Sequence, residues 1–116
     1  MRIVGKELGV PTFQGDVAFV RVSEIPAGAK LLGKVGGRII VAHSETGHHH
    51  VAVAEKIRLF GVDDPMVCYL SNESEYADIV HERSFDTHET VRLLGGCWKI
   101  IRQRESAPEG WRMVQD

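Results

Sequence analysis

Short apolar runs separated by polar and glycine-containing segments recur along the whole chain. The run Asp16–Ser23 is nearly continuous in apolar side chains, and it ends at Ile25–Gly28, where proline and glycine favour a turn. A second run, Arg38–His43, is followed by the polar segment Ser44–Gly47 and then by His48–Glu55. Two apolar runs joined by a short loop that ends in glycine predict a β-hairpin.

The second half of the chain repeats this arrangement, with pairs of short runs around turn-forming residues. The predicted hairpins are Met66–Leu70 with Tyr76–Glu82 around Ser71–Ser74, and Glu89–Leu93 with Cys97–Arg104 around Leu94–Gly96. We expect Gly33–Gly37 to form another hairpin turn and Trp111–Val114 to close the sheet.

The residue types along these runs also favour strands. Valine and isoleucine together number 22, against 15 for leucine plus alanine, and β-branched side chains pack well on a pleated surface. No window of about a dozen residues keeps a helical period. A length of 116 residues suits one domain, residues 1–116. The sequence therefore predicts an all-β domain, a small antiparallel barrel or jelly-roll-like sandwich of about eight short strands.

Composition and charge exclude several classes of protein. Hydrophobic residues make up 43% and charged residues 26%, which is typical of a folded globular protein and not of a disordered chain. No apolar run approaches the roughly 20 residues that span a bilayer, and the first residues do not resemble a signal peptide. A net charge of −2 without a basic run does not favour nucleic acid. We expect a protein that stays on the cytoplasmic side, with no membrane and no direct nucleic-acid partner.

The two cysteines, Cys68 and Cys97, lie apart and each stands beside an aromatic residue. Neither belongs to a C-x-x-C motif or to a zinc-knuckle spacing. Two buried free thiols are the simplest interpretation, and the sequence leaves open whether they pair.

The histidines are concentrated in the middle of the chain, since all six fall between His43 and His88. In the predicted hairpin, His43 and His48 stand opposite each other, and strand alternation puts His50 on the same face as His48. We expect His81 to point inward, so a closed sheet would bring His81 or Glu82 to this patch. Three imidazoles at this separation can be the ligands of a divalent transition metal such as zinc, iron, nickel, manganese or copper.

Two other interpretations of these histidines remain open. Histidines at strand ends also form hydrogen bonds with neighbouring carbonyls or with acids such as Glu45 and Glu89, without any metal. A cluster of imidazoles can also respond to pH near neutrality.

The spacing His48-x-His50-x4-Glu55, followed by Gly61, resembles the first motif of the cupins, small β-barrels that hold a divalent metal. The resemblance covers about 14 residues of the chain. It implies a metal site of His48, His50, Glu55 and either His81 or His88. With His43 added from the hairpin geometry, the residues expected to bind a metal are His43, His48, His50, Glu55 and His81. On this interpretation the chain is a metal-binding protein or a metalloenzyme.

A broader resemblance spans about 70 residues, to small proteins encoded in phage and prophage regions. It lies in the segments His43–Val51, Val80–Glu82, Ile101–Glu105 and Trp111–Val114. The resemblance itself implies only that the gene stands among phage genes. Together with the small size, the β content and the lack of a complete catalytic set, it leads us to expect a structural protein of a phage particle, a capsid decoration, cement or connector subunit, present in the virion after assembly in the host cytoplasm. The expected partners are other virion proteins such as a capsid protein, and further copies of the chain in a homo-oligomer.

The uneven charge suggests how such subunits meet. Residues 63–89 hold eight acidic side chains and one arginine, whereas the C-terminal quarter has a mild basic bias. We expect these two regions to pair between adjacent subunits. No complete catalytic set is recognisable in the sequence, so a non-enzymatic role is the leading hypothesis and the metalloprotein is the alternative.

Overall fold

Every regular element in the described part of the structure, a computed structural model, is a β-strand. The structure describes residues 2–4, 7–43, 49–81, 89–102, 104–107 and 110–113. Its radius of gyration of 13.6 Å matches the roughly 13 Å expected for a compact chain of this length. Within the described ranges, no helix has the length and apolar character needed to cross a membrane.

The described residues form nine strands, and those from β4 to β7 are much longer than the others. They are β1 (Arg2–Val4), β2 (Pro11–Gln14), β3 (Val17–Val22), β4 (Lys30–Ala42), β5 (His50–Gly61), β6 (Val67–His81), β7 (Val91–Arg102), β8 (Arg104–Ala107) and β9 (Gly110–Met113).

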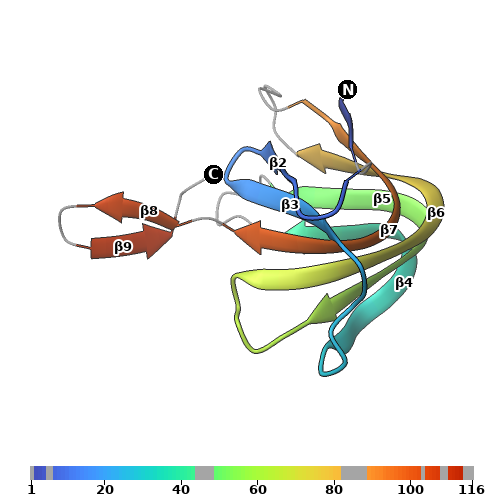
Figure 1. Cartoon of the computed structure of the whole chain (residues 1–116), viewed down its shortest axis with the longest axis horizontal. Coiled ribbons are helices and arrows are strands. Elements are labelled where there is room, and N and C mark those ends of the chain that lie inside the picture. The colour runs from blue at the N-terminus through green and yellow to red at the C-terminus, as the bar shows by residue number, and fades with distance from the viewer. Residues whose placement is uncertain are drawn as a thin grey trace.

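Seven of these strands form one sheet in the order β2-β3-β7-β6-β5-β4, with β1 alongside β7 (Figure 1). All pairs in it are antiparallel except β1 with β7. The prediction of an all-β antiparallel fold is therefore confirmed. No pairing in the described ranges joins β4 to β2, so the sheet is not closed into a barrel. The predicted closing strand, β9, pairs instead with β8 in a separate two-stranded sheet.

The segments predicted as turns lie inside long strands. Ser71–Ser74 belongs to β6, Leu94–Gly96 to β7 and Gly33–Gly37 to β4. At these places the strand pairing shifts, for example between Asn72 and Tyr76 in the β6–β7 ladder. A shift of this kind is a β-bulge, which bends a strand without ending it. The predicted short strands are therefore halves of longer ones.

Local hydrogen bonds explain why turn-forming residues fit these bulges. The side-chain oxygen of Asn72 accepts a hydrogen bond from the Ser74 backbone N–H at 2.9 Å, and the Ser74 hydroxyl accepts one from the Lys56 backbone N–H, also at 2.9 Å. Gly96 has a φ of +135°, which side chains rarely adopt. The side chains of Asn72 and Ser74 thus satisfy backbone groups that the shifted ladder leaves unpaired.

The bulges lie at neighbouring positions of β4, β5, β6 and β7, so together they cross the sheet. Figure 1 shows the long strands curving through this bend. The bend folds the sheet over itself, since Cys68 Sγ in β6 lies 3.5 Å from the Val41 carbonyl in β4, a strand with which β6 does not pair. Buried side chains from β3 to β7 meet in one cluster, and its largest fully buried members include Trp98, Phe19, Ile57, Leu70, Ile79 and Leu93.

Candidate functional site

Four polar side chains lie inside the core at one end of the β5–β6 ladder, and we call Gln14, Asp16, His50 and His81 the polar cluster. His50 is completely buried, Gln14 and His81 are each 2% exposed, and the Asp16 side chain is 5% exposed. Burying polar groups is costly unless they are hydrogen-bonded, so the contacts within this cluster decide what it does.

A tight turn between β2 and β3 brings Gln14 and Asp16 to the cluster. Gln14 pairs with Val17, which leaves a two-residue connection of Gly15 and Asp16. Gly15 has a φ of +60°, as expected for glycine at the first central position of a hairpin turn. The turn thus places an amide and a carboxylate over the end of the sheet.

Gln14 connects three parts of the fold through its side-chain amide. Its Nε2 donates to the carbonyl oxygens of Ile79 at 2.8 Å and Glu89 at 3.0 Å. Because Nε2 is the donor, Oε1 is the acceptor, and it lies 2.8 Å from Nδ1 of His50. The imidazole of His50 therefore carries its hydrogen on Nδ1 and donates it to Gln14.

The other ring nitrogen of His50 faces Asp16, with Nε2 3.6 Å from Oδ1. On its face, the His50 ring stacks on the His81 ring, with centroids 4.1 Å apart and planes 10° apart. The arrangement is a buried histidine pair held by an amide and a carboxylate.

The structure brings together only some of the residues predicted to bind a metal. His50 and His81 are direct partners in the β5–β6 ladder, and both side chains point inward. His43 is exposed, and its ring lies 5.2 Å from that of His49. Glu55 is exposed on β5. His48, Glu82 and His88 lie outside the described residues.

The prediction that His43 and His50 share a face differs from the structure because of one bulge. The pairs Ile39 with Ala52 and Ile40 with Val51 follow the register of the predicted four-residue loop. The next pair, Ala42 with His50, is shifted by one residue. A one-residue shift turns a side chain to the other face, so His43 faces outward while His50 is buried.

The geometry of His50 and His81 does not suit a shared metal ion. A nitrogen ligand donates in the plane of its ring at about 2.0 Å, and two stacked rings 4.1 Å apart have no common in-plane point. Within the described ranges, no three His, Cys, Asp or Glu side chains are grouped to hold a metal. The complete ligand set stays a prediction, since it includes His48.

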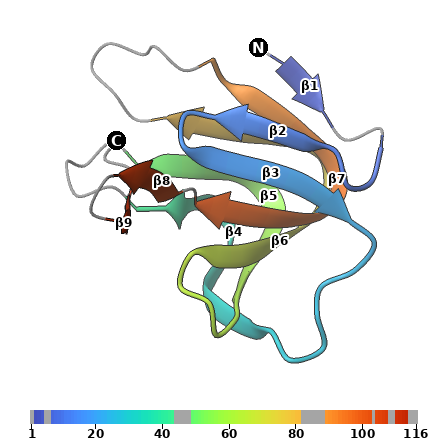
Figure 2. The ribbon, with the colours of Figure 1, turned by 60° about the vertical axis from the view of Figure 1, so that its left-hand side comes forward.

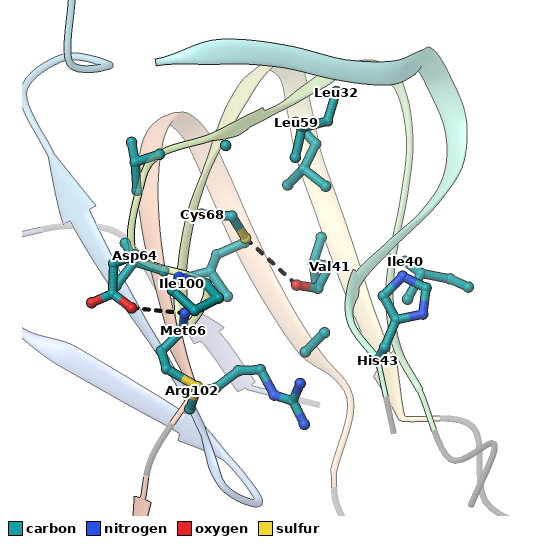
Figure 3. A pocket seen from close by; sticks show the side chains of 15 residues that line it. Leu32, Ile40, Val41, His43, Leu59, Asp64, Met66, Cys68, Ile100 and Arg102 are labelled. Carbon is teal, nitrogen blue, oxygen red and sulfur yellow. Dashed lines mark hydrogen bonds between the residues drawn. The ribbon is translucent and has the colours of Figure 1, made fainter. Parts of the chain in front are cut away.

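A pocket of about 310 Å³ lies where the opposite end of the β5–β6 ladder meets the end of β4 (Figure 3). Its walls are mostly aliphatic, with Cys68 in the wall and Arg102 and His43 at one end. The sequence predicts neither this pocket nor a role for Arg102 in it. No local motif marks it, because the pocket forms between segments that only the bend of the sheet brings together.

The two cysteines are free and half-buried. Burial raises the pKa of the Cys68 thiol from its ordinary 9.0 to about 12. The thiol therefore stays protonated at neutral pH, and it lies within weak hydrogen-bond distance of the Val41 carbonyl.

A family model described as "Domain of unknown function (DUF8820)" matches residues 13–103. The chain belongs to the DUF8820 family. The DUF8820 match begins within β2 and ends after β7, so it contains the whole polar cluster and the pocket, and it leaves out β1, β8 and β9. No curated protein and no solved structure matches the chain.

Proposed function

We propose that this protein is a structural subunit of a phage or prophage particle, a capsid decoration, cement or connector protein. It binds neighbouring virion proteins, such as a capsid protein, and further copies of itself. The observation that carries the proposal is an open sheet edge with exposed apolar side chains in the N-terminal segment.

Strand β2 ends the sheet order, so one of its sides has no neighbouring strand in the described part of the chain. The segment around it carries large apolar side chains with high exposure: Ile3 59%, Leu8 59%, Val10 52% and Phe13 45%. Figure 2 shows β1 and β2 near one another, and the Arg2 guanidinium donates a hydrogen bond to the Phe13 carbonyl. We call Ile3, Leu8, Val10 and Phe13 the N-terminal apolar set.

An exposed edge of this kind favours a protein partner. Pro11 has no N–H and the Phe13 carbonyl is engaged by Arg2, so β2 offers a partner mainly its exposed apolar side chains, which give hydrophobic contact. Each such contact is small, since β2 has only four residues. Repetition of a weak contact over a symmetric shell gives avidity, which suits a subunit that decorates or cements a particle.

Fewer charged groups can pair between subunits than the sequence predicted. Asp78 from the acidic stretch binds Arg92 within the chain, with the two oxygen–nitrogen distances at 2.7 and 3.0 Å. These two groups are therefore engaged inside the subunit. Exposed acids such as Asp63 and Glu73 remain available for a basic neighbour.

The experiment uses phage particles assembled from the encoding genome after this gene has been deleted. Purified protein is added to them, and the bound fraction is measured after centrifugation. We expect the wild-type protein to bind the particles and Phe13→Ser to bind at least about tenfold more weakly, because a large apolar contact is lost.

The matched control is Val53→Ser, which changes an exposed apolar residue on β5 away from the N-terminal apolar set. It should bind as the wild type does. Wild-type protein that does not bind these particles, or equal binding by Phe13→Ser, contradicts the proposal.

A further inference from the structure

The pocket at the Cys68 end of the sheet has the composition of a small-molecule site. Its walls are formed mainly by aliphatic side chains, among them Leu32, Val41, Leu59, Met66 and Ile100. Ligand sites are typically apolar cavities of about 300 Å³ or more with a few placed polar groups. The cavity of about 310 Å³ is at the lower end of that range, so it suits a small ligand.

Arg102 supplies the placed polar group. Its backbone N–H donates to the Met66 carbonyl at 2.8 Å, which fixes the residue beside the pocket wall. Its side-chain Nε is buried and has no hydrogen-bond partner among the described residues. A buried guanidinium nitrogen without an acceptor is costly, and a ligand oxygen at this position would remove that cost.

The other polar groups of the pocket are consistent with an anionic ligand at the Arg102 end. Figure 3 shows Arg102 and His43 at the same end of the pocket, with Leu32 and Leu59 at the other. The Asp64 carboxylate is engaged by the Met66 backbone N–H at 2.9 Å. One end of the pocket therefore carries the Arg102 guanidinium, and the opposite end is aliphatic.

We propose that this pocket binds a small aliphatic carboxylate, with its hydrocarbon chain among the leucines and its carboxylate on Arg102. The size of the ligand follows from the volume. At about 30 Å³ for a water-sized group, 310 Å³ holds about ten non-hydrogen atoms, which is the size of octanoate. A carboxylate oxygen accepts the hydrogen bond that Nε of Arg102 offers, and the guanidinium adds a charge-assisted contact.

The test is a titration of the full-length protein with octanoate and with octanamide, which has the same length but no charge. Binding is followed by calorimetry and by the NMR signal of the Met66 methyl group. We expect octanoate to bind one to one and to shift the Met66 signal, and octanamide to bind about tenfold more weakly, because it forms no charge-assisted bond.

Two variants separate the role of Arg102 from overall charge. Arg102→Gln should bind octanoate as weakly as the wild type binds octanamide, while Arg58→Gln, which removes an exposed positive charge on β5, should leave octanoate binding unchanged. Circular dichroism checks that both variants are folded. Failure of the wild type to bind octanoate, an unchanged Met66 signal, or equal octanoate affinity in Arg102→Gln overturns the proposal.

Discussion

The two ends of the β5–β6 ladder are closed in different ways. At the end where His50 pairs with His81, the side-chain amide of Gln14 forms hydrogen bonds with the Ile79 and Glu89 carbonyls and with Nδ1 of His50 inside the protein. At the end where Gly61 pairs with Cys68, the fold leaves an aliphatic pocket beside a buried arginine nitrogen. The first end is closed by the hydrogen bonds of one amide, whereas the second leaves a cavity.

The largest effect should come from removing the amide that closes the polar end. In Gln14→Leu, the carbonyls of Ile79 and Glu89 and the ring N–H of His50 lose their partner. Each buried group left unsatisfied costs about 1–3 kcal/mol, so we expect a loss of about 3 kcal/mol or more in the free energy of unfolding. Urea denaturation measures it.

The control for this variant is Thr12→Val, a half-buried position on the same strand. It should change the free energy of unfolding by less than about 1 kcal/mol. A loss below about 1 kcal/mol in Gln14→Leu would show that the polar cluster does not hold this end together.

The next largest effect concerns the bend on which both ends depend. A methyl group added at Gly95 would lie 2.9 Å from the backbone carbonyl oxygen of Ser74, so the bulge must shift to accept it. We expect Gly95→Ala to cost about 2 kcal/mol. Gly28→Ala is the matched control, since a Cβ there meets no atom within 4 Å, and it should be neutral. Thermal unfolding of both variants checks this, and equal stabilities would contradict the bend as a tightly packed element.

A smaller effect, dependent on pH, is expected at the pocket end. The folded state raises the pKa of Cys68 to about 12, so between about pH 9 and 12 the unfolded chain loses this proton first. The contribution of Cys68 to stability is therefore fully present below pH 9 and falls as the pH rises toward 12. Denaturation at several alkaline pH values should show a steeper loss in the wild type than in Cys68→Ala, and parallel losses would rule out a buried Cys68 thiol.

The smallest effect is expected in metal content. The stacked rings of His50 and His81 do not converge on an ion, so protein purified without a His tag should contain no stoichiometric transition metal. Elemental analysis of the wild type and of the double variant His48→Ala with His50→Ala decides this. Stoichiometric metal that disappears in the double variant would instead support the cupin-like site.

Much of the fold follows from local pattern, because strands of alternating or apolar residues are specified locally. The strand at Val17–Val22 and the β4–β5 pairing near Ile39 and Ala52 agree with the predicted runs. The predicted turns at Ser71–Ser74 and Leu94–Gly96 are wrong, since the same residue types are also suited to a β-bulge. Local sequence does not decide between a turn and a bulge, because neighbouring strands on both sides settle it.

The candidate site was predictable only in part for the same reason. Alternation along β6 with Ala77 and Ile79 indicated that His81 points inward, and it is buried. The outward turn of His43 depends on one bulge, and the contact of His50 with Gln14 joins residues 36 positions apart. Such contacts arise from the bend of the sheet, which no short motif encodes.

Sedimentation velocity of the wild-type protein, over a roughly hundredfold range of concentration, tests most directly whether this chain binds neighbouring subunits. We expect a species larger than the monomer that dissociates on dilution, and a shift toward monomer in Phe13→Ser at every concentration. A wild-type protein that stays monomeric throughout, or one whose assembly is unaffected by Phe13→Ser, would contradict it.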